Sequence, residues 1–240
     1  MFKETKFRSV IKSISYRFLT TLATVALVLI FTGRVDIAFT VGGLEFIIKM
    51  MIYFSHERLW DKIKWGKQEI QPCVVWITGL SGAGKTSIAK KVAEKLREKK
   101  LKTDHLDGET VRNIFPKTGF SRAEVNEHIK RVGFLASKLE SRGVFVVASF
   151  LSPFRESRDF VRGVCNNFIE VYLSTPIEIC EKRNSKKLYS RARKGEIKNL
   201  PGVDVQYEKP DNPELIIDAG YWSVDDAASE VLTYLTRYMD

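Results

Sequence analysis

The segment GLSGAGKT at residues 79–86 constrains the fold of this chain more than any other feature. It has the spacing GxxxxGK[ST], follows the apolar β-branched run CVVWIT at 73–78, and leads into a stretch with helical periodicity at 87–99. Its three glycines let the backbone wrap around an anion, so that successive N–H groups and a helix N-terminus face phosphate oxygens. We therefore expect a phosphate cradle formed by Gly79, Leu80, Ser81, Gly82, Ala83, Gly84, Lys85, Thr86 and Ser87.

Two side chains of this cradle carry chemistry. Lys85 is expected to reach the β- and γ-phosphates of bound ATP and to act in catalysis, and the Thr86 hydroxyl is expected to bind Mg²⁺. The plain alternative is a glycine-rich turn that only joins a strand to a helix. Because strand, loop, lysine, hydroxyl and helix occur in the required order, the sequence favours the phosphate site.

The remainder of the C-terminal part alternates short β-branched runs with helical stretches. This alternation predicts an α/β fold of the P-loop kinase type, a parallel sheet with helices on both faces and ligands at the carboxyl ends of the strands. The expected strands are 73–78, 101–107, 144–150, 168–173 and 214–218, and the expected helices are 87–99, 110–115, 123–141, 155–164, 176–183 and 224–239.

The residues after the second and third expected strands indicate which P-loop class this is. No NKxD motif of a GTPase is present, and the run VFVVASF ends in Ser149 and Phe150 rather than in the acid of a large ATPase. The second strand instead ends in Asp107, with Glu109 two residues later. We expect both carboxylates to be catalytic, with Asp107 also binding Mg²⁺ and acceptor, and Arg112 to clamp an acceptor anion. The alternative is that Glu109 and Arg112 form only a surface ion pair at the start of a helix and have no part in a site.

Two apolar runs, 14–32 and 37–54, precede the predicted kinase. Their flanks are rich in Lys and Arg, so the positive-inside rule places both chain ends in the cytosol if the runs form a two-helix transmembrane hairpin. We expect a membrane hairpin domain at 1–66, a linker at 67–72 and a P-loop kinase domain at 73–240, on the inner (cytoplasmic) membrane with the kinase facing the cytosol. A cleaved signal peptide and a soluble two-helix cap are alternatives, and Glu45 and Lys49 favour the cap.

The formal net charge of +10 does not by itself indicate a nucleic-acid partner. The basic residues are concentrated in the first twelve positions and in 182–198, and no aromatic-interleaved basic strand or recognition helix accompanies them. Cys73, Cys165 and Cys180 lack metal-ligand spacing, which is typical of buried free thiols in a reducing cytosol. We expect no nucleic-acid partner and no cysteine metal site.

The kinase part resembles the adenylylsulfate kinase family from about residue 73 to the end. The resemblance lies in GLSGAGKT, LDGETVR at 106–112, GF at 119–120, RVG at 131–133, ASFLSPFRESRDFVR at 148–162, FIEVYLSTPIEICEKR at 168–183, KKLYSRARKGEIKN at 186–199, and GVD and YEKP within 202–210. It implies transfer of the ATP γ-phosphate to the 3′-hydroxyl of adenosine 5′-phosphosulfate, giving 3′-phosphoadenylylsulfate and ADP. Residues 1–66 are similar to a small predicted membrane domain through KSISYR and HERLW.

The resemblance also implies roles for individual residues. Ser152 matches a serine that contacts the acceptor and is a phosphorylated site in some members, so we expect it to be catalytic, although its neighbours offer no activating base. The basic tract 183–198 matches a mobile lid that closes over the phosphates. Family members are often homodimers. The implied acceptor-binding residues are Asp107, Arg112, Phe120, Arg131, Leu151, Ser152, Lys187 and Lys198.

Departures from the family pattern fall on acceptor recognition. Glu109 replaces an Asp, Val125 and His128 replace an Arg and an Asn, and Leu200 replaces an aromatic residue that helps to sandwich the adenine. A kinase of the same fold acting on another activated nucleotide, for example in surface polysaccharide modification, is therefore an alternative. A nucleotide-binding membrane regulator that has lost catalysis is another.

Overall fold

The structure is a computed structural model that describes residues 6–62, 71–115, 119–183 and 187–238. The chain forms two compact units, residues 1–67 and 68–240, which we describe separately. Most of the expected linker, residues 67–70, lies outside the described residues.

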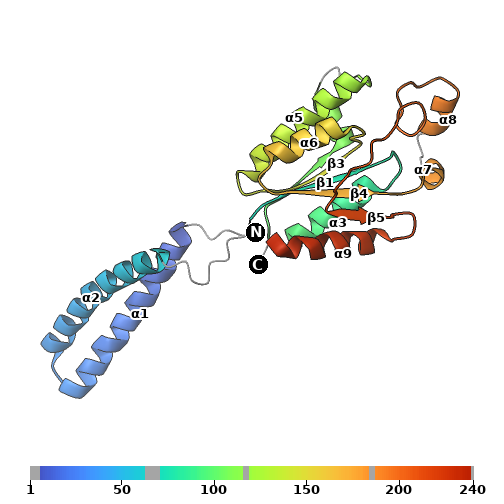
Figure 1. Ribbon diagram of the computed structural model, residues 1–240. Helices are drawn as coiled ribbons and strands as arrows, with labels where there is room; N and C mark the ends of the chain where they lie inside the picture. Colours follow the sequence, from blue (N-terminus) through green and yellow to red (C-terminus); the bar gives the residue numbers. More distant parts are fainter. Residues whose placement is uncertain (1–5, 63–70, 116–118, 184–186, 239–240) are drawn as a thin grey trace. The chain divides into compact units, whose positions relative to one another are not determined.

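The N-terminal unit is a pair of helices, α1 (Lys6–Thr32) and α2 (Val35–Lys62) (Figure 1). Gly33 makes the turn between them, with φ at 64° and its N–H donating to the Leu29 carbonyl at 2.9 Å. Gly42 of α2 packs so closely on Val25 of α1 that a side chain at residue 42 would overlap it. The two expected helices are thus present, and both are longer than the apolar runs that predicted them, but the transmembrane hairpin is not confirmed. Among the helices of the described residues, none combines the length and the apolar character that crossing a membrane requires.

The C-terminal unit is built on one five-stranded sheet in which every described pairing is parallel. The strand order β2-β3-β1-β4-β5 puts β1 in the middle and β2 at one edge. This confirms the predicted parallel α/β sheet. The strands are β1 (Val74–Gly79), β2 (Thr103–Asp107), β3 (Phe145–Phe150), β4 (Phe168–Leu173) and β5 (Leu215–Ile217).

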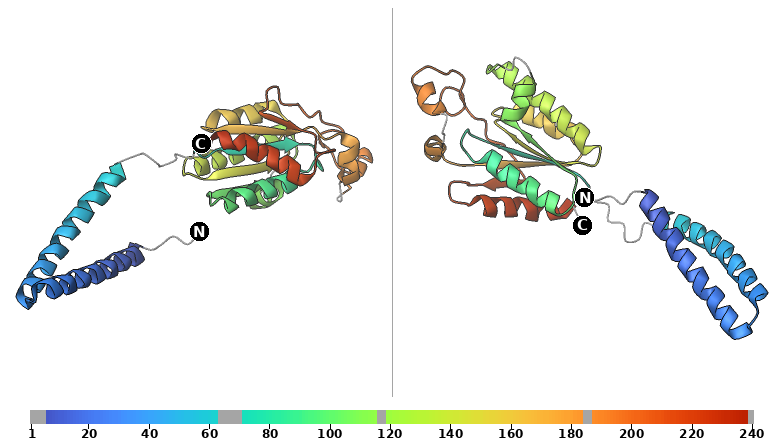
Figure 2. Two further views of the ribbon diagram at one scale, coloured as in Figure 1. Left: turned by 90° about the horizontal axis from the view of Figure 1, so that it is seen from below. Right: turned by 180° about the vertical axis from the view of Figure 1, so that it is seen from behind.

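Helices cover both faces of the sheet. Helices α3 (Lys85–Glu98) and α9 (Val224–Leu235) lie side by side on one face, whereas α5 (Arg122–Glu140) and α6 (Arg155–Val164) lie on the other (Figures 1 and 2). The shorter elements are α4 (Gly108–Ile114), α7 (Ile177–Arg183), α8 (Leu188–Arg193) and the 3₁₀ turn η1 (Thr236–Tyr238).

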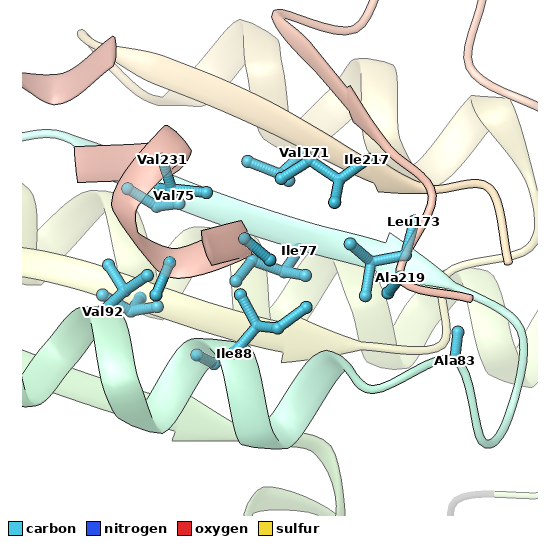
Figure 3. Packing of buried hydrophobic residues seen from close by; sticks show 14 of the residues in the cluster. Val75, Ile77, Ala83, Ile88, Val92, Val171, Leu173, Ile217, Ala219 and Val231 are labelled. Atoms are coloured by element: carbon cyan, nitrogen blue, oxygen red, sulfur yellow. The ribbon is translucent and has the colours of Figure 1, made fainter. Parts of the chain in front are cut away.

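The alternation of side chains along the central strand divides the core between the two faces. Val75 and Ile77 point toward α3 and α9, where Ile88 and Val92 of α3 meet them (Figure 3). Trp76 points toward α5 and α6 and stacks on Phe150, with ring centroids 5.3 Å apart. Each such fully buried side chain stabilises the fold by about 1.5–3 kcal/mol. The core therefore holds β1 rigidly and with it the loop that begins at its carboxyl end.

Parallel pairing brings the functional segments to one edge of the sheet. In the register of β2 with β3, Asp107 pairs with Ser149, and in the register of β1 with β3, Thr78 pairs with Phe150. The segments that follow Gly79, Asp107 and Phe150 consequently leave the sheet next to one another.

Candidate active site

The phosphate loop has the backbone shape that its glycines predict. Gly82 and Gly84 adopt φ values of 80° and 99°, which L side chains rarely tolerate. A Cβ at Gly82 would also lie 2.5 Å from the Cys180 carbonyl oxygen, so the loop packs directly on α7. Gly84 precedes α3 and has no side chain to cap it, which leaves the first N–H groups of that helix directed at the loop. The loop is therefore shaped to bind an anion.

The Lys85 side chain lies against the loop. Its Nζ donates to the carbonyl oxygens of Gly79 at 3.0 Å and Leu80 at 2.7 Å. Burial lowers the pKa of Lys85 to about 8, and the nearby Asp107 opposes that shift. A phosphate bound in the cradle would restore the stability of the charged form, because an anion replaces part of the hydration that burial removes.

Asp107 joins the phosphate loop to the second strand. Its Oδ1 accepts from Thr86 Oγ1 at 2.8 Å, and its Oδ2 accepts from the backbone N–H groups of Glu109 at 3.1 Å and Thr110 at 3.4 Å, which caps α4. Burial alone would raise the pKa of Asp107, but these hydrogen bonds and one from Ser149 hold it below its usual value. The carboxylate is thus kept ionised beside the Thr86 hydroxyl.

A cavity of about 760 Å³ lies beside the phosphate loop, and Asp107 and Glu109 are on its wall. Two arginines on its wall stack on aromatic rings: the Arg112 guanidinium lies 4.4 Å from the Phe120 ring centroid, and that of Arg122 lies 4.3 Å from the Phe154 ring. The wall includes Lys85, Thr86, Asp107, Glu109, Arg112, Phe120, Arg122, Val125, His128, Ile129, Ser149, Phe150, Leu151, Pro153 and Phe154. The cavity wall thus combines the carboxylates of Asp107 and Glu109 with two arginines that stack on aromatic rings.

A second cavity, of about 610 Å³, lies on the other side of the loop. Arg183 and Trp222 line it, and Arg183 Nη1 donates to the Ala219 carbonyl at 2.7 Å. Lys85 and Thr86 line both cavities. The end of the phosphate cradle therefore lies between the two cavities. A phosphate donor bound in one cavity could meet a phosphate acceptor bound in the other there.

The basic segment after α7 is tied to the phosphate loop. In the described residues 187–198 it forms the short helix α8, whose buried Tyr189 donates from its hydroxyl to the Ser81 carbonyl at 2.8 Å. Residues 184–186 of the expected lid lie outside the described residues.

Comparison with known proteins decides the family. The adenylylsulphate kinase family model matches residues 71–218. The adenylyl-sulfate kinase of Gloeothece citriformis is 44% identical over 164 residues, which cover 68% of this chain and 93% of that protein. This chain belongs to the adenylylsulfate kinase family.

Further relatives agree with this assignment. A probable adenylyl-sulfate kinase of Halalkalibacterium halodurans is 41% identical over 74% of this chain and 92% of that protein. The solved APS kinase of Mycobacterium tuberculosis, in complex with AMPPNP and APS, superposes with a TM-score of 0.66 at 38% identity, covering 69% of this chain and 98% of that one. A second family model, described as a predicted membrane protein, matches residues 10–61. The chain is thus an adenylylsulfate-kinase-type enzyme preceded by a domain of a predicted membrane family.

Several residues expected at the acceptor site of this adenylylsulfate kinase family member do line the larger cavity. Asp107, Glu109, Arg112, Phe120 and Leu151 are on its wall. Phe120 is 60% exposed, so it is a cavity residue and not a core residue. The departures Val125 and His128 line the same cavity.

Ser152 requires a correction, because the structure does not bring its side chain to the cavity. It is fully buried, and its Oγ accepts from Trp76 Nε1 at 3.0 Å and shares a hydrogen bond with Thr78 Oγ1 at 2.8 Å. The strand β1 holds both partners, so Ser152 fastens the 151–154 segment to the sheet. A role as a phosphorylated or acceptor-contacting residue does not fit this burial.

Three further basic residues, Arg131, Lys187 and Lys198, are expected to contact the acceptor. Arg131 pairs with Glu127 on the same helix, and Lys187 lines a small cavity with Glu181 and Tyr189. None of the three is on the described wall of either large cavity. Leu200, where the family has an aromatic residue, packs in the core at 7% exposure. Leu188 and Asn199, the chain neighbours of Lys187 and Lys198, do line the larger cavity. Contact of the three basic residues with an acceptor therefore stays a prediction.

Sequence reasoning missed Tyr189, Trp222 and Ser149 as parts of the site. Trp222 is a large aromatic side chain, 43% exposed, in the turn before α9, and that exposed position is the kind of signal that indicates a ligand. Nothing in the sequence near Tyr189 indicates that it meets Ser81, which lies 108 positions away.

Proposed function

We propose that this protein transfers the γ-phosphate of ATP to the 3′-hydroxyl of adenosine 5′-phosphosulfate, giving 3′-phosphoadenylylsulfate and ADP. The observation that carries the proposal is that Lys85 and Thr86 line both large cavities. ATP in the cavity of Arg183 and Trp222 would direct its terminal phosphate toward the larger cavity. There the paired guanidinium–aromatic stacks suit an acceptor with a planar base and a phosphosulfate group.

Thr86 and Asp107 are the proposed Mg²⁺-binding residues. Their Oγ1 and Oδ1 atoms lie 2.8 Å apart, and hydroxyl and carboxylate oxygens are the ligands that Mg²⁺ prefers, with water and phosphate oxygens completing its shell. The donor set therefore fits the metal. When bound, the ion would neutralise charge on the phosphate oxygens.

The residues of the chain are proposed to contribute to catalysis in two ways, by stabilising negative charge on the phosphates and by taking one proton from the acceptor. The loop N–H groups and Lys85 bind the phosphates and offset the negative charge that develops during transfer. Glu109 lies on the wall of the larger cavity, where its carboxylate would orient the acceptor hydroxyl and take its proton. Asp107 accepts four hydrogen bonds and so holds the start of α4. On metal binding, its Oδ1 would exchange the hydrogen bond from Thr86 for the ion or for a water bound to it.

The test is to incubate the purified full chain with ATP, Mg²⁺ and adenosine 5′-phosphosulfate. We expect ADP and 3′-phosphoadenylylsulfate in equal amounts, with Lys85→Ala reducing turnover by about 100-fold or more. Lys95→Ala is the control, because Lys95 forms an exposed pair with Glu98 on the same helix and lines neither large cavity of the described structure. ADP release that needs a different nucleotide acceptor would replace this acceptor assignment, and ATP binding without acceptor-dependent ADP release would indicate a lapsed kinase.

A kinase with another activated nucleotide as acceptor is the second candidate. Its support is that Val125 and His128 both line the acceptor cavity. Burial, with Arg112 and Arg131 adding to it, lowers the pKa of His128 to about 4, so this side chain presents a neutral ring near neutral pH. A panel of nucleotide acceptors in the same assay distinguishes the two candidates.

We further propose that residues 14–54 attach the enzyme to the inner membrane with the kinase on the cytosolic side. The supports are the predicted-membrane family match at 10–61, the basic flanks and the exposed apolar side chains of both helices, among them Ile30 at 77% and Met51 at 68%. The full chain should sediment with membranes and be released by detergent, and recovery in the soluble fraction would contradict this. A homodimer also stays a prediction, which light scattering of the detergent-purified chain would test.

A further inference from the structure

The pairing of β2 with β3 brings three polar side chains together behind the phosphate loop. Asp107 and Ser149 are direct partners in this parallel register. His105 precedes Asp107 by two residues, so the alternation of side chains along a strand puts both on the same face of the sheet. This is the face covered by α3, the helix that carries Thr86.

These side chains form a hydrogen-bonded chain. Ser149 Oγ donates to Asp107 Oδ1 at 3.2 Å, and His105 Nε2 lies 3.2 Å from the same Ser149 oxygen. A serine hydroxyl has one hydrogen, and an ionised carboxylate can only accept. The Ser149 hydrogen is therefore used on Asp107, and the hydrogen between Ser149 and His105 must come from Nε2 of the imidazole.

The contact adds a second donor to Oδ1 of Asp107. Oδ1 accepts from Thr86 and Ser149, and Oδ2 accepts from the N–H groups of Glu109 and Thr110. Two donors on each oxygen determine both the position and the plane of the carboxylate. Ser149 is 2% exposed, so its hydroxyl has little access to water as a substitute partner.

We propose that Ser149 and His105 are positioning residues, which hold the Asp107 carboxylate in the orientation that it needs beside Thr86 and the phosphate cradle. The proposal rests on the proposed phosphotransfer site, and it assigns a role to two residues that the phosphate-loop motif does not include. His105 acts through Ser149 and not on substrate. Its Nε2 keeps its hydrogen in both charge states of the ring, so the chain of hydrogen bonds does not depend on its titration.

The first test is Ser149→Ala in the full-length protein. Loss of one donor to a charged oxygen should weaken Mg²⁺-dependent ATP binding, and raise the Mg²⁺ concentration for half-maximal binding, by about tenfold. Binding of ATP in excess chelator should change less than about twofold, because the loop amides and Lys85 are untouched. Ser149→Thr keeps the hydroxyl and should retain Mg²⁺ dependence. Ser137→Ala is the matched control, because Ser137 is a buried serine whose hydroxyl donates to the Phe134 carbonyl within its own helix.

The second test separates the two ring nitrogens of His105. His105→Gln places an amide donor near the position of Nε2 and should retain wild-type binding, whereas His105→Asn places it near Nδ1 and should weaken Mg²⁺-dependent binding by about threefold. Added to Ser149→Ala, His105→Asn should cause no further loss, because its effect passes through Ser149.

Two outcomes would overturn the proposal: unchanged Mg²⁺ dependence in Ser149→Ala, or additive losses in the double variant. A general loss of folding would lower chelator-resistant ATP binding as well, and would so be recognised. None of these measurements needs an acceptor. A failed adenylylsulfate assay would therefore refute the acceptor assignment without deciding the role of Ser149 and His105.

Discussion

The Tyr189 hydroxyl donates a hydrogen bond to the Ser81 carbonyl at 2.8 Å, and this contact joins the basic segment after α7 to the middle of the phosphate loop. Tyr189 is 2% exposed, and its ring belongs to the same hydrophobic core cluster as Ala83 of the phosphate loop. The shape of the phosphate cradle thus depends on a residue more than a hundred positions away.

Replacing Tyr189 with Phe should remove this hydrogen bond while keeping the ring in place. We expect a loss of about 1 kcal/mol of stability and an increase of about fivefold in KM for ATP, with kcat little changed. Tyr221→Phe is the control, because Tyr221 is 84% exposed. Steady-state kinetics and thermal denaturation measure the two effects, and an unchanged KM would show that the loop keeps its shape without Tyr189.

The Glu109 carboxylate is the proposed base. Glu109→Gln keeps the size of the side chain but cannot take a proton, so kcat should fall by about 100-fold or more while ATP binding stays near wild type. Glu109→Asp should be intermediate, since the shorter side chain keeps the carboxylate but moves it. Equal activity of wild type and Glu109→Gln would show that Glu109 is not the base and that another group takes the proton.

Ser152 should matter for stability and not as a phosphate carrier. Ser152→Ala leaves Trp76 Nε1 and Thr78 Oγ1 without their shared buried partner, which should lower the free energy of unfolding by about 1–3 kcal/mol. The folded variant should keep kcat within a few-fold. Ser157→Ala is the matched control, because that buried hydroxyl donates to the nearby Phe154 carbonyl. Detection of labelled phosphate on Ser152 after incubation with ATP would contradict this prediction.

His128 should make stability depend on pH. Its pKa is about 4 in the fold because of burial and the nearby Arg112 and Arg131, against an ordinary value of 6.5. The unfolded chain therefore binds a proton below pH 6.5 that the folded chain excludes, and stability falls as the pH falls from 6.5 toward 4. The slope for this one group is at most about 1.4 kcal/mol per pH unit, and it fades over about one pH unit above pH 6.5 as the unfolded chain loses its proton.

His128→Asn should remove this component. Chemical denaturation between about pH 5 and pH 7 compares the two proteins, and the wild type should lose more stability than the variant over that interval. Parallel curves would mean that His128 titrates normally in the fold.

Much of the fold could be predicted because its signals are local. Each of the five expected strands is present within two residues of its predicted ends, since alternating β-branched runs bounded by helical stretches repeat along the chain. The helix α8 was missed because its six residues, LYSRAR, have no apolar periodicity and bury only Tyr189. Its structure comes from docking on Ser81.

The active site divides in the same way. GLSGAGKT determined by itself the loop geometry and the position of Lys85 at the start of α3, because glycine conformations and helix termini depend on neighbouring residues. Only the tertiary structure decided that Ser152 turns into the core while Ser149 faces Asp107, and that Trp222 shares a cavity with the phosphate loop. Those outcomes depend on strand register and on packing between segments distant in sequence, where burial of apolar area and satisfaction of polar groups act over the whole domain.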